Sequence, residues 1–291
     1  MRTKPKRTLM EAFLTFFGDL KVFRWPMFLL YQPGGYQLKG EDVREVLEKI
    51  RPGDILVRGY LDYLDGYFIP GYFSHVGLYL GDVTEQDRGS VMASKQAHHE
   101  CDPVFRTGQQ MVIHALAEGV LLEDILQFCR CDYMAILRLP DAIKAPPGAA
   151  PQLIEEALFS EDEKKLHHRL QGGETLSISE VVACVRAAAL GKLGTAYDFK
   201  FDFARFEKLS CSELVYFATK CVSPFLGIAA QDRKVLFVKR SMIIPDAFVD
   251  SPLDVVWKSK SIRNEKFAVL RQNWPSESPA VGMDEKTVDV V

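Results

Sequence analysis

Alternation of apolar and polar residues is clearest over 74–80, which reads SHVGLYL. Side chains of an extended strand point to opposite faces in turn, so this pattern predicts a strand. One face carries the apolar residues Val76, Leu78 and Leu80. The other face carries His75, Gly77 and Tyr79. A histidine at the head of an apolar strand is either a buried structural residue or a catalytic base.

The same kind of pattern predicts the other main elements. Strands are predicted at 55–58, 110–116 and 133–140, with a turn and a strand within 245–259. Helices are predicted at 41–50, 121–130, 177–194 and 210–222. We expect an α+β fold, in which an antiparallel sheet packs against the helix at 210–222.

Changes of composition divide the chain into three parts. Residues 1–50 form an N-terminal extension that we expect to be helical, and residues 51–260 form the main domain. Two segments interrupt that domain: a polar one at about 82–110, expected as a long loop or an insertion, and one at 140–176, expected as an insertion or small subdomain with a linker and a charged helix. Residues 261–291 form a C-terminal tail, which is polar from about 273 and expected to be disordered there.

Charge and cysteine content narrow the class of protein. The net charge of −3 shows no basic excess, so we expect no nucleic-acid partner. Six cysteines are few for 291 residues, and we find no secretory leader, so we expect reduced thiols and a cytoplasmic location. The apolar run at 22–31 is too short to cross a bilayer.

The first twenty residues leave two interpretations open. A basic start precedes an apolar helical stripe formed by Met10, Phe13, Leu14, Phe16 and Phe17. This stripe either packs on the domain or makes peripheral contact with a membrane surface.

Cys211 is the candidate nucleophile. It follows Ser210, a residue that can cap a helix, and begins the predicted helix CSELVYFATK. The positive end of the helix dipole and the free N–H groups favour a thiolate there and can stabilise an oxyanion. A small buried core residue is the alternative. Cys184 falls on an apolar helix face, and Cys221 lies at the helix end where the dipole has the wrong sign.

A nucleophilic thiol needs a base, usually histidine. His75 and His114 each lie on an apolar strand, and the other four histidines lie in polar segments. If the strands at 74–80 and 110–116 pair antiparallel, the two imidazoles can share a face, and His114 can orient His75. Two structural histidines with satisfied hydrogen bonds are the alternative.

Metal and nucleotide chemistry have little support in the sequence. HHEC at 98–101 and CRC at 129–131 contain possible zinc ligands, but the spacing does not match a known zinc pattern. The phosphate-binding loops and the GxSxG motif are missing. We expect neither a metal nor a cofactor.

The motifs together resemble the circularly permuted branch of papain-like, NlpC-type cysteine hydrolases. They are RPGDILVRG, SHVGLYLGD, VIHALAEGV, YDFKFDF and SCSELVYFA, in that order. YiiX/YebB-like proteins are the nearest group, and lecithin–retinol acyltransferase is a more distant relative. In this branch the histidine strand precedes the cysteine helix, as it does here. The resemblance covers roughly 51–256 apart from the two interruptions.

The resemblance implies roles for individual residues. Cys211 matches the nucleophile, His75 matches the base, and His114 falls at the third polar position, with Glu118 as the fallback. Tyr197 matches a tyrosine that lines the pocket.

Two further residues are expected near the substrate. Gly77 and Tyr79 share the face of His75, and Gly77 leaves room beside it. Glu213 is expected to anchor its helix rather than to act as a catalytic acid.

The expected chemistry is acyl transfer through a thioester on Cys211. The resemblance implies a cysteine hydrolase of the peptidase or amidase kind, or an acyltransferase, with a peptide or a lipid as the acyl substrate. The alternative is a catalytically silent binding or scaffold module that keeps the papain-like fold.

Overall fold

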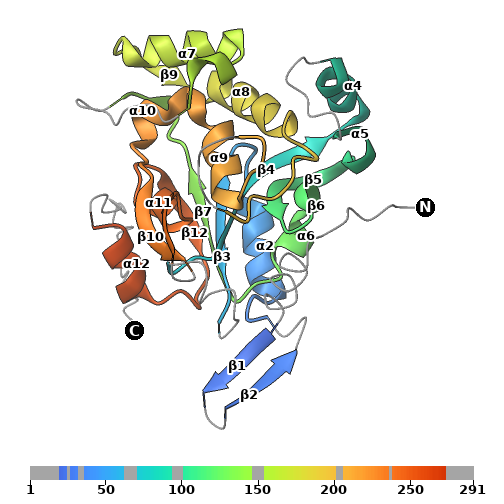
Figure 1. Ribbon diagram of the computed structural model, residues 1–291, viewed down its shortest axis with the longest axis vertical. Coiled ribbons are helices and arrows are strands. Elements are labelled where there is room, and N and C mark those ends of the chain that lie inside the picture. The colour runs from blue at the N-terminus through green and yellow to red at the C-terminus, as the bar shows by residue number, and fades with distance from the viewer. Residues whose placement is uncertain are drawn as a thin grey trace, which may run out of the picture.

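The centre of the fold is a six-stranded sheet in which all neighbouring strands are antiparallel (Figure 1). The structure is a computed structural model that describes residues 20–24, 27–31, 36–61, 71–93, 101–145, 154–200, 206–235 and 238–272. In spatial order the strands are β12 (Asp254–Lys258), β7 (Tyr133–Arg138), β3 (Ile55–Gly59), β4 (His75–Val83), β5 (Gly108–Leu116) and β6 (Gly119–Asp124). With helices on both faces, the sheet confirms the α+β expectation.

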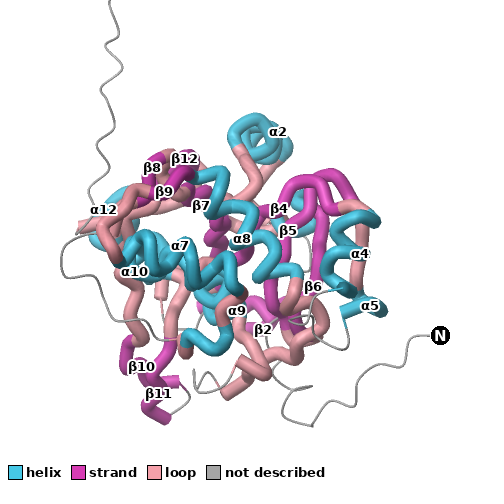
Figure 2. The backbone as a smooth tube through the Cα atoms, turned by 90° about the horizontal axis from the view of Figure 1, so that it is seen from above, coloured by secondary structure: helices cyan, strands magenta, loops and turns pink. Residues whose placement is uncertain are grey.

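One face of the sheet is covered by α8 (Ile178–Leu190) and α9 (Cys211–Ala218). Val76 and Leu78 of β4 are buried in the same apolar cluster as Leu214 of α9, which we call the first core. Figure 2 shows α8 and α9 on the side of the sheet opposite α2. The apolar face of β4 that the sequence predicts is therefore the face that receives α9.

The other face is covered by α2 (Gly40–Lys49) and the short α6 (Ile125–Phe128). Tyr79 and Val112 are buried there with Phe128, in a second, smaller apolar cluster that we call the second core. Because side chains alternate along β4, His75 belongs to this second face and not to the face of α9.

The described part of the segment at 82–110 is not an irregular loop, so the loop alternative is wrong there. It contains α4 (Glu85–Ala93) and α5 (Cys101–Val104). Thr84 and Asp87 cap the N-terminus of α4, where the Thr84 N–H donates to the Asp87 carboxylate at 2.8 Å. The helix is hard to recognise from sequence because it buries only Val91.

The helix expected at 121–130 is also wrong over its first half. Residues up to Asp124 form β6, which pairs with β5, and only the short α6 is helical. Apolar residues at 121, 122, 125 and 128 fit a helical period, but they are shared between a strand and one helical turn.

The described part of the N-terminal extension consists of two paired strands and the helix α2. β1 (Leu20–Arg24) and β2 (Met27–Tyr31) pair antiparallel, so the described part of the extension is not wholly helical. The apolar stripe predicted at 10–17 lies outside the described residues. In the parts of the chain that the structure describes, no helix combines the length and apolar character needed to cross a membrane.

The segment at 140–176 forms a small helical addition. It contains β8 (Ala142–Ile143), η1 (Glu156–Leu158), α7 (Glu161–Gln171) and β9 (Leu176–Ser177). β8 pairs with β9.

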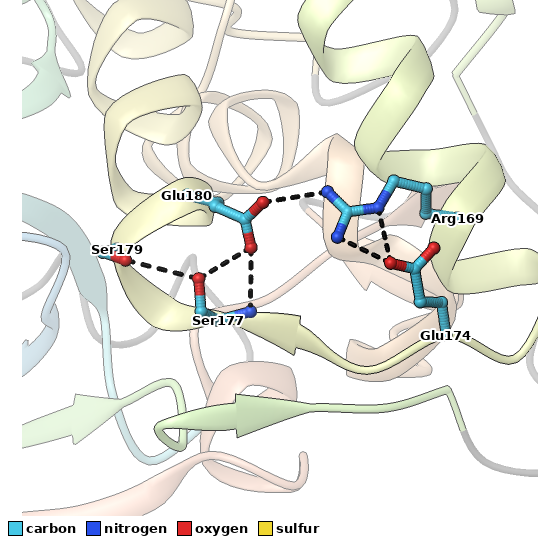
Figure 3. A network of polar contacts seen from close by, with 5 residues as sticks. All are labelled: Arg169, Glu174, Ser177, Ser179 and Glu180. Carbon is cyan, nitrogen blue, oxygen red and sulfur yellow. Dashed lines mark hydrogen bonds and ion pairs between the residues drawn. The ribbon is translucent and has the colours of Figure 1, made fainter.

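Charged side chains fix the turn between α7 and α8. Arg169 lies between Glu174 and Glu180, at 2.7 and 2.9 Å, and Glu180 also accepts from Ser177 at the start of α8 (Figure 3). These side chains are exposed, so the network orients the turn more than it stabilises the fold.

β12 forms one edge of the six-stranded sheet, and the other C-terminal segments lie outside that sheet. They are η2 (Lys220–Val222), α10 (Ser223–Leu226), β10 (Gln231–Val235), β11 (Val238–Met242), α11 (Asp246–Val249) and α12 (Asn264–Leu270). α12 lies within the predicted tail. The part of that tail from 273 is outside the described residues.

Asp246 holds the entrance to β4 from the far end of the chain. Its carboxylate accepts hydrogen bonds from the N–H groups of Tyr72, at 2.6 Å, and Phe73, at 2.7 Å. Gly71, with a φ of 141°, brings the backbone so close to Asp246 that a Cβ atom would lie 2.8 Å from the carboxylate. The position of His75 therefore depends on α11.

Candidate active site

The two strand histidines form a buried hydrogen-bonded pair. His75 Nε2 lies 2.8 Å from His114 Nδ1, and the side chains are almost fully buried. β4 and β5 pair antiparallel, with Tyr79 opposite Val112. The predicted pairing of these strands and the shared face of the two imidazoles are therefore confirmed.

A carboxylate that the sequence analysis missed continues this line. Glu123 Oε2 on β6 lies 3.2 Å from His114 Nε2, which is close enough for an ion pair. The geometry of this contact is not that of a good hydrogen bond. We call His75, His114 and Glu123 the polar row. Glu123 escaped detection because it was assigned to a helix. The signal that could have revealed β6 is the two-residue connection at 117–118, which is typical of a tight hairpin between two strands. Leu116 pairs with Gly119 across it.

The polar row indicates which ring nitrogens carry protons. A carboxylate favours a proton on His114 Nε2, which leaves His114 Nδ1 as an acceptor. His75 must then donate from Nε2, and its Nδ1 is the basic nitrogen. Among the described residues, Nδ1 of His75 has no hydrogen-bond partner. This tautomer is the one that a general base needs.

Cys211 lies at the N-terminus of α9, as predicted. Ser210 caps this helix, and the Glu213 carboxylate accepts a hydrogen bond from the Ser210 N–H at 2.7 Å. Glu213 therefore anchors the helix, as expected. The N–H groups of Val76 and Ser212 lower the pKa of the Cys211 thiol, against the effect of burial. Cys211 and Val76, the residue that follows His75, are buried in the same first core.

The thiol and the base approach the start of β4 from different faces. α9 packs on the face of Val76, whereas the His75 ring lies on the face of α6. Within the described residues, no hydrogen bond joins the sulfur to the imidazole. A proton transfer between them requires the two groups to move closer than they are here.

Burial keeps both groups neutral. It lowers the pKa of His75 well below its usual value, and the positive charge of Arg58 and the neighbouring His114 lower it further. Burial raises the pKa of the Cys211 thiol, although the N–H groups of Val76 and Ser212 oppose this. The resting site is a neutral thiol beside a neutral imidazole pair.

Burial and the contact between Glu123 and His114 have opposite effects on the pKa values of these two residues. Burial lowers the pKa of His114, and Glu123 opposes that change. Burial would raise the pKa of Glu123, but His114 and Arg58 bring it below its usual value. Glu123 is therefore a carboxylate at neutral pH.

Three other predicted residues lie around the polar row. The space beside Gly77 is filled by Phe128 and Val112, and Tyr79 is buried with its hydroxyl donating to Gln110. Glu118 lies in the exposed hairpin turn and acts on His114 through its charge. The room that Gly77 provides is thus occupied by the protein itself.

Tyr197 is half-buried in the loop that leads to Cys211, with its ring centroid 4.9 Å from that of Phe199. The parallel bridge between Ala196 and Lys208 ties this loop to the segment before α9. Over the described residues, no three His, Cys, Asp or Glu side chains converge as metal ligands. His98 and His99 lie outside those residues.

Replacing Gly77 with alanine should destabilise the protein. The new Cβ would lie 2.8 Å from a carbon of the Phe128 ring and 3.0 Å from Val112. Overpacking of this kind costs about 1–3 kcal/mol, which urea unfolding would measure. Gly89→Ala is the matched control, because that helical position is open and should gain stability instead. Equal effects of the two substitutions would contradict the packing described here.

Acid should destabilise the fold before any carboxylate is protonated. Burial, as the largest cause, lowers the pKa values of His75, His114 and His167 in the folded protein. Below pH 6.5 the unfolded chain takes up protons that the folded protein does not, so the free energy of unfolding falls as the pH falls. Each such histidine contributes up to about 1.4 kcal/mol per pH unit until its folded pKa is reached.

Urea unfolding between pH 7.5 and 5 would measure this slope. His167→Gln should reduce this slope by up to about 1.4 kcal/mol per pH unit, the effect of one bound proton, and it leaves the polar row unchanged. A free energy of unfolding that does not change over this range would contradict the buried, neutral histidines.

The chain was compared with known proteins in three ways. No protein-family model, no curated protein and no experimentally determined structure matches it.

Proposed function

We propose that this protein is a cysteine-dependent acyl-transfer enzyme with a permuted papain-like fold. It acts as an amide or ester hydrolase, or as an acyltransferase, through a thioester on Cys211. One observation carries the proposal: the polar row ends at the first residue of β4, and Cys211 at the start of α9 is buried in the same core as Val76, the next residue of that strand. A buried base, its orienting groups and a thiol at a helix N-terminus are the parts that this chemistry needs.

The mechanism assigns a role to each residue. Cys211 attacks the carbonyl carbon as its proton passes to His75 Nδ1, and the Cys211 N–H at the start of α9 binds the oxyanion. The bond to the leaving group breaks, and His75 returns the proton to that group. Water or an acceptor nucleophile then attacks the thioester, loses its proton to His75, and restores the thiol. His114 and Glu123 hold the His75 tautomer.

Mass spectrometry of the intact protein tests the proposal. The protein is incubated with panels of peptide amides, activated esters and lipid esters, and a trapped acyl group is located by its mass and by peptide mapping. Cys211→Ala should abolish the adduct, whereas Cys184→Ala should leave it, because burial raises the pKa of the Cys184 thiol to about 11. No adduct on Cys211 with any panel member would favour a scaffold module instead.

Glu123→Gln should slow acylation of Cys211 by about tenfold, the scale expected for one charge-assisted contact. Glu123 raises the pKa of His114, so its loss should also move the acid limb of the pH–rate profile to lower pH. Stopped-flow acylation by an activated ester across pH 4.5–8 would measure both effects.

Two matched variants separate orientation from folding. Glu123→Asp should restore part of the rate, and Glu265→Gln should keep the rate of the wild type, because that side chain is exposed on α12 and is no part of the polar row. An unchanged rate and profile in Glu123→Gln would remove this residue from the mechanism.

A further inference from the structure

Arg58 extends the polar row to a fourth strand. It lies on β3 directly opposite His75 on β4, so their side chains share a face. Phe128 covers the guanidinium group, whose carbon lies 4.1 Å from the ring centroid. One nitrogen, Nη1, donates to the Phe128 carbonyl at 2.6 Å. Only 5% of Arg58 is exposed.

In the described part of the chain, Arg58 makes no ion pair at contact distance, and Glu123 acts on it only through longer-range charge. Nε of Arg58 is buried without a hydrogen bond, and no carboxylate lies at ion-pair distance from the guanidinium. Arg138 by contrast holds Asp54 with two bonds of 2.7 Å, and Lys220 holds Glu163. Arg271 donates to three backbone carbonyls. A buried charge without such compensation is costly, and an anionic ligand would relieve that cost.

Two polar atoms at this end of the row remain accessible. Among the described residues, Nη2 of Arg58 and Nδ1 of His75 do not belong to the fully buried side-chain atoms that lack a hydrogen-bond partner. Neither atom has a hydrogen bond. Both atoms are therefore not completely buried, and they belong to residues that face each other across one pair of strands.

We propose that Arg58 binds an anionic oxygen group of the acyl donor, a carboxylate or a phosphate, beside His75. This inference rests on the proposed function and specifies its substrate class as acidic acyl donors. A guanidinium fork suits such groups because its N–H donors match two oxygens in one plane. Nη2 makes the contact, because Nη1 already donates to the Phe128 carbonyl and Nε is buried.

Alkylation of Cys211 by a neutral and an anionic reagent tests this inference. Iodoacetamide and iodoacetate transfer groups of similar size to sulfur and release iodide, but only iodoacetate carries a carboxylate. The ratio of iodoacetate to iodoacetamide rates at Cys211 should exceed the ratio at Cys184 in the same chain by about tenfold. Arg58→Gln should bring the Cys211 ratio down to that of Cys184. Arg130→Gln, an exposed arginine near the same face, should leave it high.

The outcomes separate the two proposals. If iodoacetamide labels Cys211 no faster than Cys184, the proposed function fails. If Cys211 reacts readily but shows no preference for iodoacetate, the anion site fails and the function stands. The wild-type ratio is informative even if Arg58→Gln does not fold. Protection of Cys211 by acetate or by inorganic phosphate then tells which anion the site prefers.

Discussion

His75→Gln is expected to lower the rate at which an activated ester acylates Cys211 by about 10²–10⁴-fold. Glutamine keeps a polar side chain of similar size but cannot take the thiol proton. The high pKa of the buried Cys211 thiol makes this loss severe, because little thiolate exists without a base. Intact-mass kinetics of acylation at pH 7 would measure the rate.

His168→Gln is the matched control for His75→Gln. His168 is an exposed histidine on α7 that lies 3.0 Å from Glu156, so its replacement should leave the rate unchanged. Thermal unfolding of both variants shows whether they fold. A folded His75→Gln protein that is acylated as fast as the wild type would show that another group activates Cys211.

Lys220→Met is expected to destabilise the protein by about 3–5 kcal/mol. Lys220 and Glu163 form an ion pair in which each residue is only 1% exposed. Removing the cation leaves the Glu163 carboxylate buried without its counter-charge. Urea unfolding at pH 7 would measure the loss.

Two further variants identify the cause of this loss. Adding Glu163→Gln to Lys220→Met should recover much of the stability, because the unpaired charge is then gone. Lys165→Met removes an exposed lysine that pairs with Asp162 on the same helix and should change little. A Lys220→Met protein as stable as Lys165→Met would show that the buried pair contributes nothing.

Local signals in the sequence were enough for the strand and the helix that carry the candidate site. The alternation over 74–80 predicted β4, and Ser210 followed by Glu213 marks the start of α9, as the structure shows. Alternation also placed each of the two histidines on a defined face, so that an antiparallel pairing of their strands would bring them together. These features depend on residues close together in the sequence.

Glu123 and Arg58 depend on contacts between distant segments. Glu123 reaches His114 only because β6 folds back on β5, and a helical period over 121–130 concealed that strand. Arg58 is buried because Phe128, 70 positions away, covers it. Neither environment can be derived from the residues that flank these positions.

The hydrogen bonds from Tyr72 and Phe73 to Asp246 join residues 174 and 173 positions apart. During synthesis, a chain that already contains Cys211 still lacks the carboxylate that fixes the backbone ahead of His75. Such late, long-range closure slows folding, because most of the chain must be ordered before the contact forms. The backbone ahead of His75 therefore gains this anchor only after Asp246 has been made, later than Cys211.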